Sequence, residues 1–144
     1  MTFNYWFAGA LFASASFSSL ADDSFPDADR LAAMNAFMAE EVSLETGYDA
    51  GGLRYLSMVV GADEATKTMS MALQLEMDAN LSIEERREIS TSMGFEHEYF
   101  SCQFLSEYLP LFSATTAFTT RITLTSADGQ VWYNAADTCE LGEL

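Results

Sequence analysis

Between Met69 and Met77 every second residue is apolar, and this alternation constrains the fold more than any other feature of the chain. The five apolar positions are Met69, Met71, Leu73, Leu75 and Met77. Alternate side chains of a β-strand point to opposite faces, so the pattern places all of them on one side of a strand. The same residue types also favour helices, and a helix here would make the chain a helical bundle with a C-terminal β-hairpin. Because tertiary packing overrides intrinsic propensity, we expect a strand over 68–77.

The chain before this strand contains one helical pattern and one further β pattern. Apolar residues recur at the three- and four-residue spacing of one helix face, at Leu31, Met34, Met38 and Val42. With a hydroxyl cap at Ser24, they predict a helix over about 27–46. A short apolar run bounded by glycines predicts a strand over 51–61, and 61–67 would then be the loop of a hairpin.

The segment after the alternating strand begins with a helix-start signal. Ser82 and Glu85 have the spacing of a capping box, in which each side chain binds the other residue's backbone amide, and they predict a helix from Ile83. Gly94 predicts a break or bend, after which the helix resumes over 96–109 and ends at a proline.

The clearest hairpin signal lies over 121–134. Asp128-Gly129 is a favoured two-residue turn because both residues tolerate positive φ. Pairing across this turn sets Leu124 opposite Tyr133. One face of the hairpin then carries Ile122, Leu124, Val131 and Tyr133. The other face carries Thr123, Thr125 and Trp132.

The predicted order is therefore α-β-β-α-β-β. We expect an α+β fold with an antiparallel sheet of about four strands and helices packed on one of its faces.

The distribution of charge divides the chain at residue 22. The first 21 residues contain no charged side chain, and all 28 Asp, Glu, Lys and Arg residues lie from Asp22 onward. The apolar stretch before this point ends in Ser19, Leu20 and Ala21, which suit a signal peptidase, and we expect cleavage after Ala21. The alternative is an uncleaved membrane anchor. We expect a periplasmic or secreted protein whose residues 22–144 form a single acidic domain.

Two cysteines, Cys102 and Cys139, lie in the part that would be exported. An even number of cysteines in an exported chain predicts a disulfide. The wide spacing argues against a redox or metal-binding C-x-x-C pair. This bond would fasten the second helical stretch to the edge of the sheet.

The net charge of −16 limits the possible partners. A chain with this charge repels nucleic acid and anionic membrane surfaces, and it attracts a cation or a basic protein. The acidic residues are spread along the chain, which is also typical of a surface adapted to salt.

Signals for catalysis are weak. His97 is the single histidine, and no G-x-S-x-G motif accompanies it. With 22 acidic residues, some pair is bound to have the spacing of glycosidase carboxylates, so their number carries no information about a hydrolase. Phosphate-binding glycine loops, clustered zinc ligands and calcium loops are absent from the sequence. No cofactor is indicated, and a small hydrolase with carboxylate catalysis is a further alternative without a nameable centre.

Soft sulfur ligands suggest one specific alternative. Met69-Ser70-Met71, together with His97 and Trp132, resembles the M-x-M, His and Trp combination of small periplasmic copper- and silver-binding proteins. The resemblance implies Cu(I) or Ag(I) binding by Met69, Met71 and His97. That family is an all-β barrel, unlike the order predicted here, and a methionine stripe on a strand is also typical of a core.

The function we expect from the sequence is that of a small exported, non-catalytic binding protein. A sheet edge or an open sheet face would contact a protein partner or a second copy of the chain. The candidate surface is formed by Trp132, Thr123 and Thr125.

Overall fold

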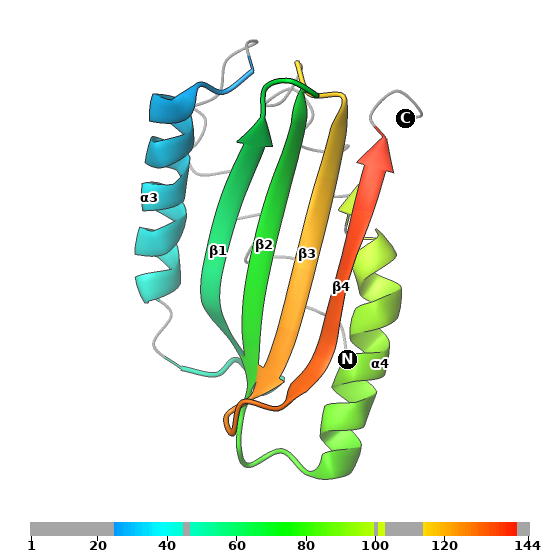
Figure 1. Cartoon of the computed structure of the whole chain (residues 1–144). Helices are drawn as coiled ribbons and strands as arrows, with labels where there is room; N and C mark the ends of the chain where they lie inside the picture. The colour runs from blue at the N-terminus through cyan, green and yellow to red at the C-terminus, as the bar shows by residue number, and fades with distance from the viewer. Residues whose placement is uncertain (1–24, 45–46, 100, 103–113, 141–144) are drawn as a thin grey trace.

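The structure is a computed structural model that describes residues 25–44, 47–99, 101–102 and 114–140. Two helices and a four-stranded sheet follow one another in the predicted α-β-β-α-β-β order (Figure 1). The elements are α3 (Ala28–Leu44), β1 (Leu53–Asp63), β2 (Thr68–Met77), α4 (Ile83–Tyr99), β3 (Ala117–Ser126) and β4 (Val131–Glu140). The α+β class and the strand over 68–77 are confirmed.

The sheet is mixed, whereas the sequence predicted an antiparallel one. Its strand order is β1-β2-β3-β4, and the two outer pairs are antiparallel hairpins. The central pair, β2 and β3, is parallel. These two strands are joined through α4, and a crossover through a helix returns the chain to the same end of the sheet, so the next strand runs in the same direction.

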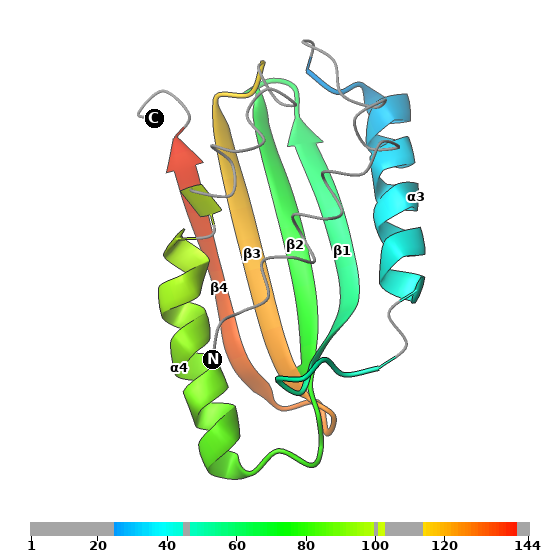
Figure 2. The same cartoon turned by 180° about the vertical axis from the view of Figure 1, so that it is seen from behind.

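The helices lie beside the two outer strands. α3 packs along β1 and α4 packs along β4 (Figures 1 and 2). Met34 and Met38 of α3, and Ile89 and Met93 of α4, belong to the same buried cluster as the inward side chains of the strands. Both helices therefore cover the same face of the sheet.

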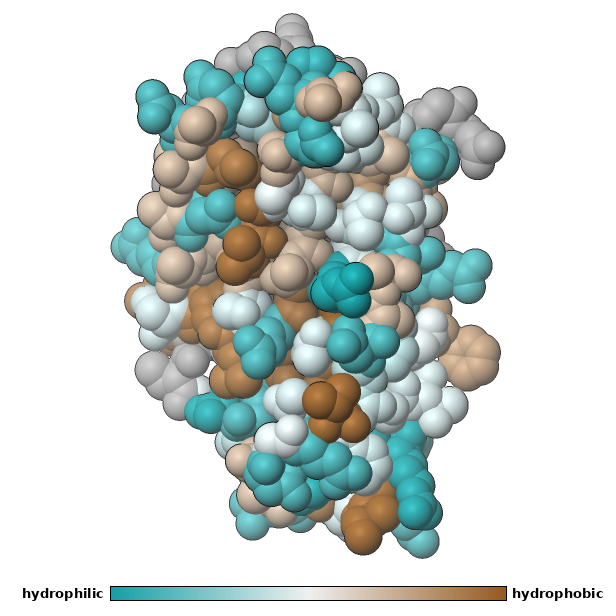
Figure 3. Space-filling view, in the orientation of Figure 1, coloured by the Kyte–Doolittle hydropathy of each residue, from teal (hydrophilic) through white to brown (hydrophobic). Residues whose placement is uncertain are grey.

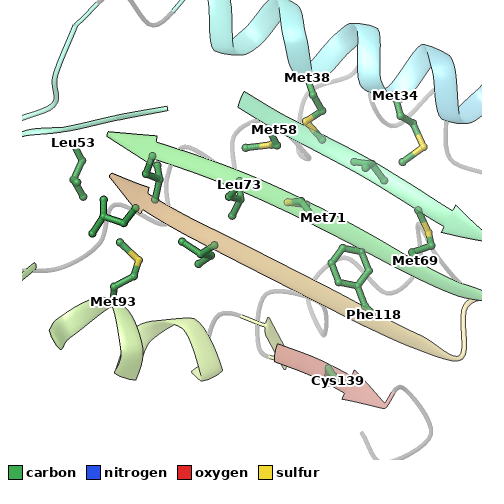
Figure 4. Packing of buried hydrophobic residues seen from close by; sticks show 14 of the residues in the cluster. Met34, Met38, Leu53, Met58, Met69, Met71, Leu73, Met93, Phe118 and Cys139 are labelled. Atoms are coloured by element: carbon green, nitrogen blue, oxygen red, sulfur yellow. The ribbon is translucent and has the colours of Figure 1, made fainter. Parts of the chain in front are cut away.

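The core follows from the alternation in β2. All of its odd-numbered residues from Met69 to Met77 are at most 2 % exposed, while Ser70, Ala72 and Gln74 between them are exposed. Methionines from the helices and strands meet these side chains in one cluster (Figure 4). The flexible thioether fills irregular space, which suits a core where helices pack against a twisted sheet.

Both helices begin with a carboxylate that binds backbone amides. Asp27 Oδ1 accepts a hydrogen bond from the Arg30 amide at 2.8 Å, so a carboxylate provides this cap where the sequence suggested a hydroxyl. The capping box of α4 is confirmed, because the Ser82 amide donates to Glu85 Oε2 at 2.7 Å and the Glu85 amide donates to Ser82 Oγ at 3.2 Å. A break or bend was predicted at Gly94, and the break is wrong, since α4 continues through this residue to Tyr99.

The β3–β4 hairpin keeps the predicted pairing of Leu124 with Tyr133 by a different route. Only Gly129 has a positive φ, of 85°, and its amide donates to the Ser126 carbonyl at 2.8 Å. The Ser126 amide donates to the Gln130 carbonyl. The loop therefore contains three residues, 127–129, and ends on a glycine with positive φ, which is a common hairpin geometry.

A bulge in β4 compensates for this longer loop. Thr125 pairs with Val131 and Leu124 pairs with Tyr133, so Trp132 is the extra residue. Val131, expected on the inner face, is therefore 56 % exposed. Trp132, expected on the outer face, is half-buried and packs against the core cluster.

The two cysteines are joined as predicted. The Cys102–Cys139 bond links the residues just after α4 to β4, with Cα atoms 5.3 Å apart. Among the described residues, none of the helices is long and apolar enough to cross a membrane. The described residues do not include the signal peptide predicted over 1–21. A helix was also predicted over 96–109, and most of its part beyond Tyr99 lies outside the described residues.

Candidate functional site

Side chains cover the outer edge of β1 at two points. The side-chain amide of Asn35 on α3 donates to the Val60 carbonyl at 2.8 Å, and its oxygen accepts from the Val60 amide at 2.7 Å. Near the start of the strand, Asp49 binds both backbone groups of Leu53, through its amide at 2.7 Å and its carboxylate at 3.0 Å. These groups are those that an added strand would use, so β1 is a poor template for edge pairing.

The outer edge of β4 is covered in a similar way. Ser90 Oγ of α4 donates to the Trp132 carbonyl at 2.6 Å, and the disulfide at Cys139 joins the same strand to the residues after α4. The sequence left both an edge and a face of the sheet as candidate surfaces. The contacts on β1 and β4 favour the face.

The centre of the sheet face opposite the helices has no acidic residue, and we call it the central patch. Outward residues of all four strands form it: Ser57, Val59 and Gly61 of β1, Ser70, Ala72 and Gln74 of β2, Thr119, Arg121 and Thr123 of β3, and Asn134, Ala136 and Thr138 of β4. Arg121 is its single charged residue, although the chain has 22 acidic residues. Figure 3 shows this face, where pale, weakly polar residues lie mainly to the right of the centre, brown ones lie to the left, and a few teal residues lie between them.

Most side chains of the central patch are short. Gly61 lies opposite Ser70, and a Cβ atom at residue 61 would stand 2.6 Å from Ser70 Oγ, closer than van der Waals contact allows. Ala72 and Ala136 lie on either side of Arg121 in the sheet. A sheet face with mostly short side chains suits contact with another surface better than enclosure of a small molecule.

Arg121 lies at the middle of the central patch and is exposed. Its Nη1 donates to Asn134 Oδ1 at 3.3 Å. Within the described residues no carboxylate forms an ion pair with it. Its remaining N–H groups are available to a ligand that approaches from outside the sheet.

Arg54 lies on the same face near the start of β1 and, unlike Arg121, has a charge partner. Arg54 binds Glu76 at 2.7 Å, and its guanidinium lies 5.0 Å from the centre of the Tyr48 ring. Tyr48 Oη also donates to Glu76 at 2.6 Å, and this hydrogen bond to a carboxylate raises the pKa of Tyr48 above its ordinary value of 10.0. Arg54 is thus neutralised within the protein, and Arg121 is not.

The sequence-predicted surface is only partly brought together. Thr123 lies in the central patch and Thr125 lies beside it, opposite Val131 on the same face. Trp132 turns toward the core, and its indole N–H donates to Ser126 Oγ at 3.0 Å. Trp132 therefore holds the end of the hairpin, and Arg121 takes its place as the prominent side chain of this face.

A second polar cluster lies inside the protein, where α4 meets β3 and β4. His97 is 2 % exposed, and Ser101 and Thr120 beside it are fully buried. His97 Nδ1 lies 2.8 Å from Tyr133 Oη, and Nε2 lies 3.1 Å from the Thr120 carbonyl and 2.9 Å from its hydroxyl. Ser101 Oγ donates to the His97 carbonyl at 2.9 Å and also contacts the Thr120 hydroxyl.

The neutral form of His97 satisfies these contacts. With the proton on Nε2, the ring donates to the Thr120 carbonyl and accepts from the Tyr133 hydroxyl at Nδ1. Burial lowers the pKa of His97 below its ordinary value of 6.5, although the bond to Thr120 and the charge of Asp137 act in the opposite direction. Because the cluster is closed to solvent, its geometry serves packing of α4 onto the sheet.

We expect this histidine to make the protein less stable in mild acid. A group whose folded-state pKa is lowered binds protons more readily in the unfolded chain, so stability is complete above pH 6.5 and is lost as the pH falls below it. The slope for one proton is at most about 1.4 kcal/mol per pH unit. Chemical unfolding measured over this range should show the loss in the wild type.

The matched variant is His97→Gln, which keeps a polar side chain and does not titrate. It should remove the pH dependence just below 6.5, and an unchanged slope would assign the effect to another group. Glu85 and Asp128 do not interfere in this range. Hydrogen bonds from Ser82 and Ser126, respectively, lower the pKa of these carboxylates below ordinary values of 4.5 and 3.8, so their contribution is lost only in stronger acid.

The residues proposed as copper ligands occupy positions with ordinary structural roles. Met69 and Met71 are 1 % exposed and lie in the core among other apolar side chains (Figure 4). His97 uses both ring nitrogens in the polar cluster. In the part of the chain that the structure describes, no three His, Cys, Asp or Glu residues are grouped to hold a metal ion.

The central patch is a feature that the sequence analysis missed. Its signal is the absence of acidic residues from the central outward positions of four strands, which becomes visible only when the strand order and register are known. Comparisons with protein-family models, with curated proteins and with solved structures return no match to this chain, so the proposals below rest on its own geometry.

Proposed function

We propose that this chain is a small exported, non-catalytic binding protein that contacts a protein partner through the open face of its sheet. The observation that carries this proposal is the central patch, which has no acidic residue although the chain has a net charge of −16. Interface centres are depleted of charged residues other than arginine, and the patch has this composition. The covered edges of β1 and β4 support a contact through the face.

The proposal of export rests on two observations. The Cys102–Cys139 bond suits an oxidising compartment, where disulfides form and persist. The uncharged first 21 residues, followed directly by acidic ones, have the character of a signal peptide.

Site-specific photo-cross-linking tests the binding role. A photoreactive phenylalanine is placed at Ala136, an exposed residue of the central patch, in the whole chain expressed with its own N-terminal segment. The exported fraction is then examined for adducts after irradiation. We expect an adduct of defined mass from Ala136, because the patch would be buried in the complex.

The control position is Thr91, which is exposed on α4, away from the sheet face. Equal adducts from Thr91 and Ala136 would show unspecific contact. Their absence at Ala136 and at a second patch position, Ala72, would refute the proposed face.

A further inference from the structure

The charge pattern of the open face indicates what kind of partner surface it would take. Eight positions surround Arg121 on the pleated face, and all are uncharged: Ser70, Ala72, Gln74, Thr119, Thr123, Asn134, Ala136 and Thr138. A cation kept apart from carboxylates in so acidic a chain has no charge partner among the described residues. A partner can supply the missing negative charge at this one point.

The guanidinium group determines the chemistry of that charge. Its planar N–H groups form two parallel hydrogen bonds with a carboxylate, and such bidentate pairs are among the stronger polar contacts in proteins. Asn134 Oδ1 accepts from Nη1, which orients the guanidinium along the sheet. The neighbouring alanines, Ala72 and Ala136, leave space above it.

We propose that the central patch binds a protein segment or surface that places a single carboxylate on Arg121, with apolar and hydroxyl-bearing groups around it. This inference rests on the binding role proposed above and names the chemistry of the partner. Val59, which is 52 % exposed and lies two strands from Arg121 in the same row of the sheet, supplies apolar contact. The hydroxyl groups of Thr119 and Thr123 supply further hydrogen bonds.

Charge also argues against two other occupants. A second copy related by a twofold axis through the patch would bring Arg121 against its own equivalent, and both copies would carry a net charge of −16. A polyanion such as nucleic acid meets the repulsion of the whole chain. A single carboxylate within a neutral or basic partner meets neither obstacle.

A short random-peptide library provides the probe, presented to the purified, disulfide-bonded protein in two arms. One arm has free C-termini and the other has amidated C-termini, which separates a terminal carboxylate from an Asp or Glu side chain. We expect selection of peptides with a carboxylate next to apolar residues. Arg121→Gln should weaken their binding by about tenfold or more, because it removes the charge and the bidentate contact.

Arg87→Gln is the matched control, since Arg87 is exposed on α4 and its loss changes the net charge equally. Binding to this variant should stay within about twofold of the wild type. Thermal unfolding of both variants confirms that they fold. No enrichment, enrichment of basic peptides, equal effects of the two substitutions, or a dimer that Arg121→Gln dissociates would overturn the inference.

The two proposals fail in different ways. If Ala136 still cross-links to its partner when residue 121 is glutamine, the open face binds but the carboxylate on Arg121 is not its ligand. If no patch position cross-links in the wild type, the binding face itself is wrong, and the inference about Arg121 falls with it.

Discussion

Replacing Cys102 and Cys139 together with serine is expected to lower the free energy of unfolding by about 4 kcal/mol. The two residues are 37 positions apart, and opening a loop of that length restores conformational freedom to the unfolded chain. The bond also fastens the end of α4 to β4, next to the buried cluster around His97. Urea unfolding with and without a reductant measures the effect.

The double variant is its own control. A reductant should destabilise the wild type by the same amount and should leave the variant unchanged. A wild type that unfolds at the same urea concentration in both conditions would show that the bond contributes nothing to stability. About 4 kcal/mol is a large share of the 5–15 kcal/mol typical of a domain, so the reduced protein should be only marginally folded.

Leu75→Ala should cost roughly 2–5 kcal/mol of stability, because Leu75 is fully buried and its truncation leaves a cavity. Gln74→Ala, one residue away, should change stability by less than about 0.5 kcal/mol, since Gln74 is exposed on the open face. Denaturant unfolding of the pair tests the inward and outward faces of β2 at adjacent positions. Equal losses would contradict the alternation on which the core depends.

Local signals predicted several elements well. The strand over 68–77 follows from a period of two, and the start of α4 follows from the reciprocal bonds of Ser82 and Glu85. The pairing of Leu124 with Tyr133 was also correct. In each case the pattern depends on residues that are close together in sequence or joined by a short turn.

Other features depend on distant parts of the chain. Gly94 stays helical because α4 packs on the sheet on both sides of it, through Met93 and His97, and this burial outweighs the intrinsic cost of glycine. The turn sequence could not predict the bulge at Trp132. The loop has one residue more than the predicted two-residue turn, and β4 has one extra residue at the bulge. Together they leave the pairing of Leu124 with Tyr133 unchanged.

By itself, the sequence determined the order of the helices and strands and which side of β2 is buried, because side-chain periodicity and capping act within a few residues. Only the tertiary structure decided that β2 and β3 are parallel, that side chains bind backbone groups on both edge strands, and that Arg121 lies among uncharged neighbours. Strand pairing joins residues about 50 positions apart, such as Ala72 and Arg121, and no local pattern records that contact. The candidate site is made of such contacts.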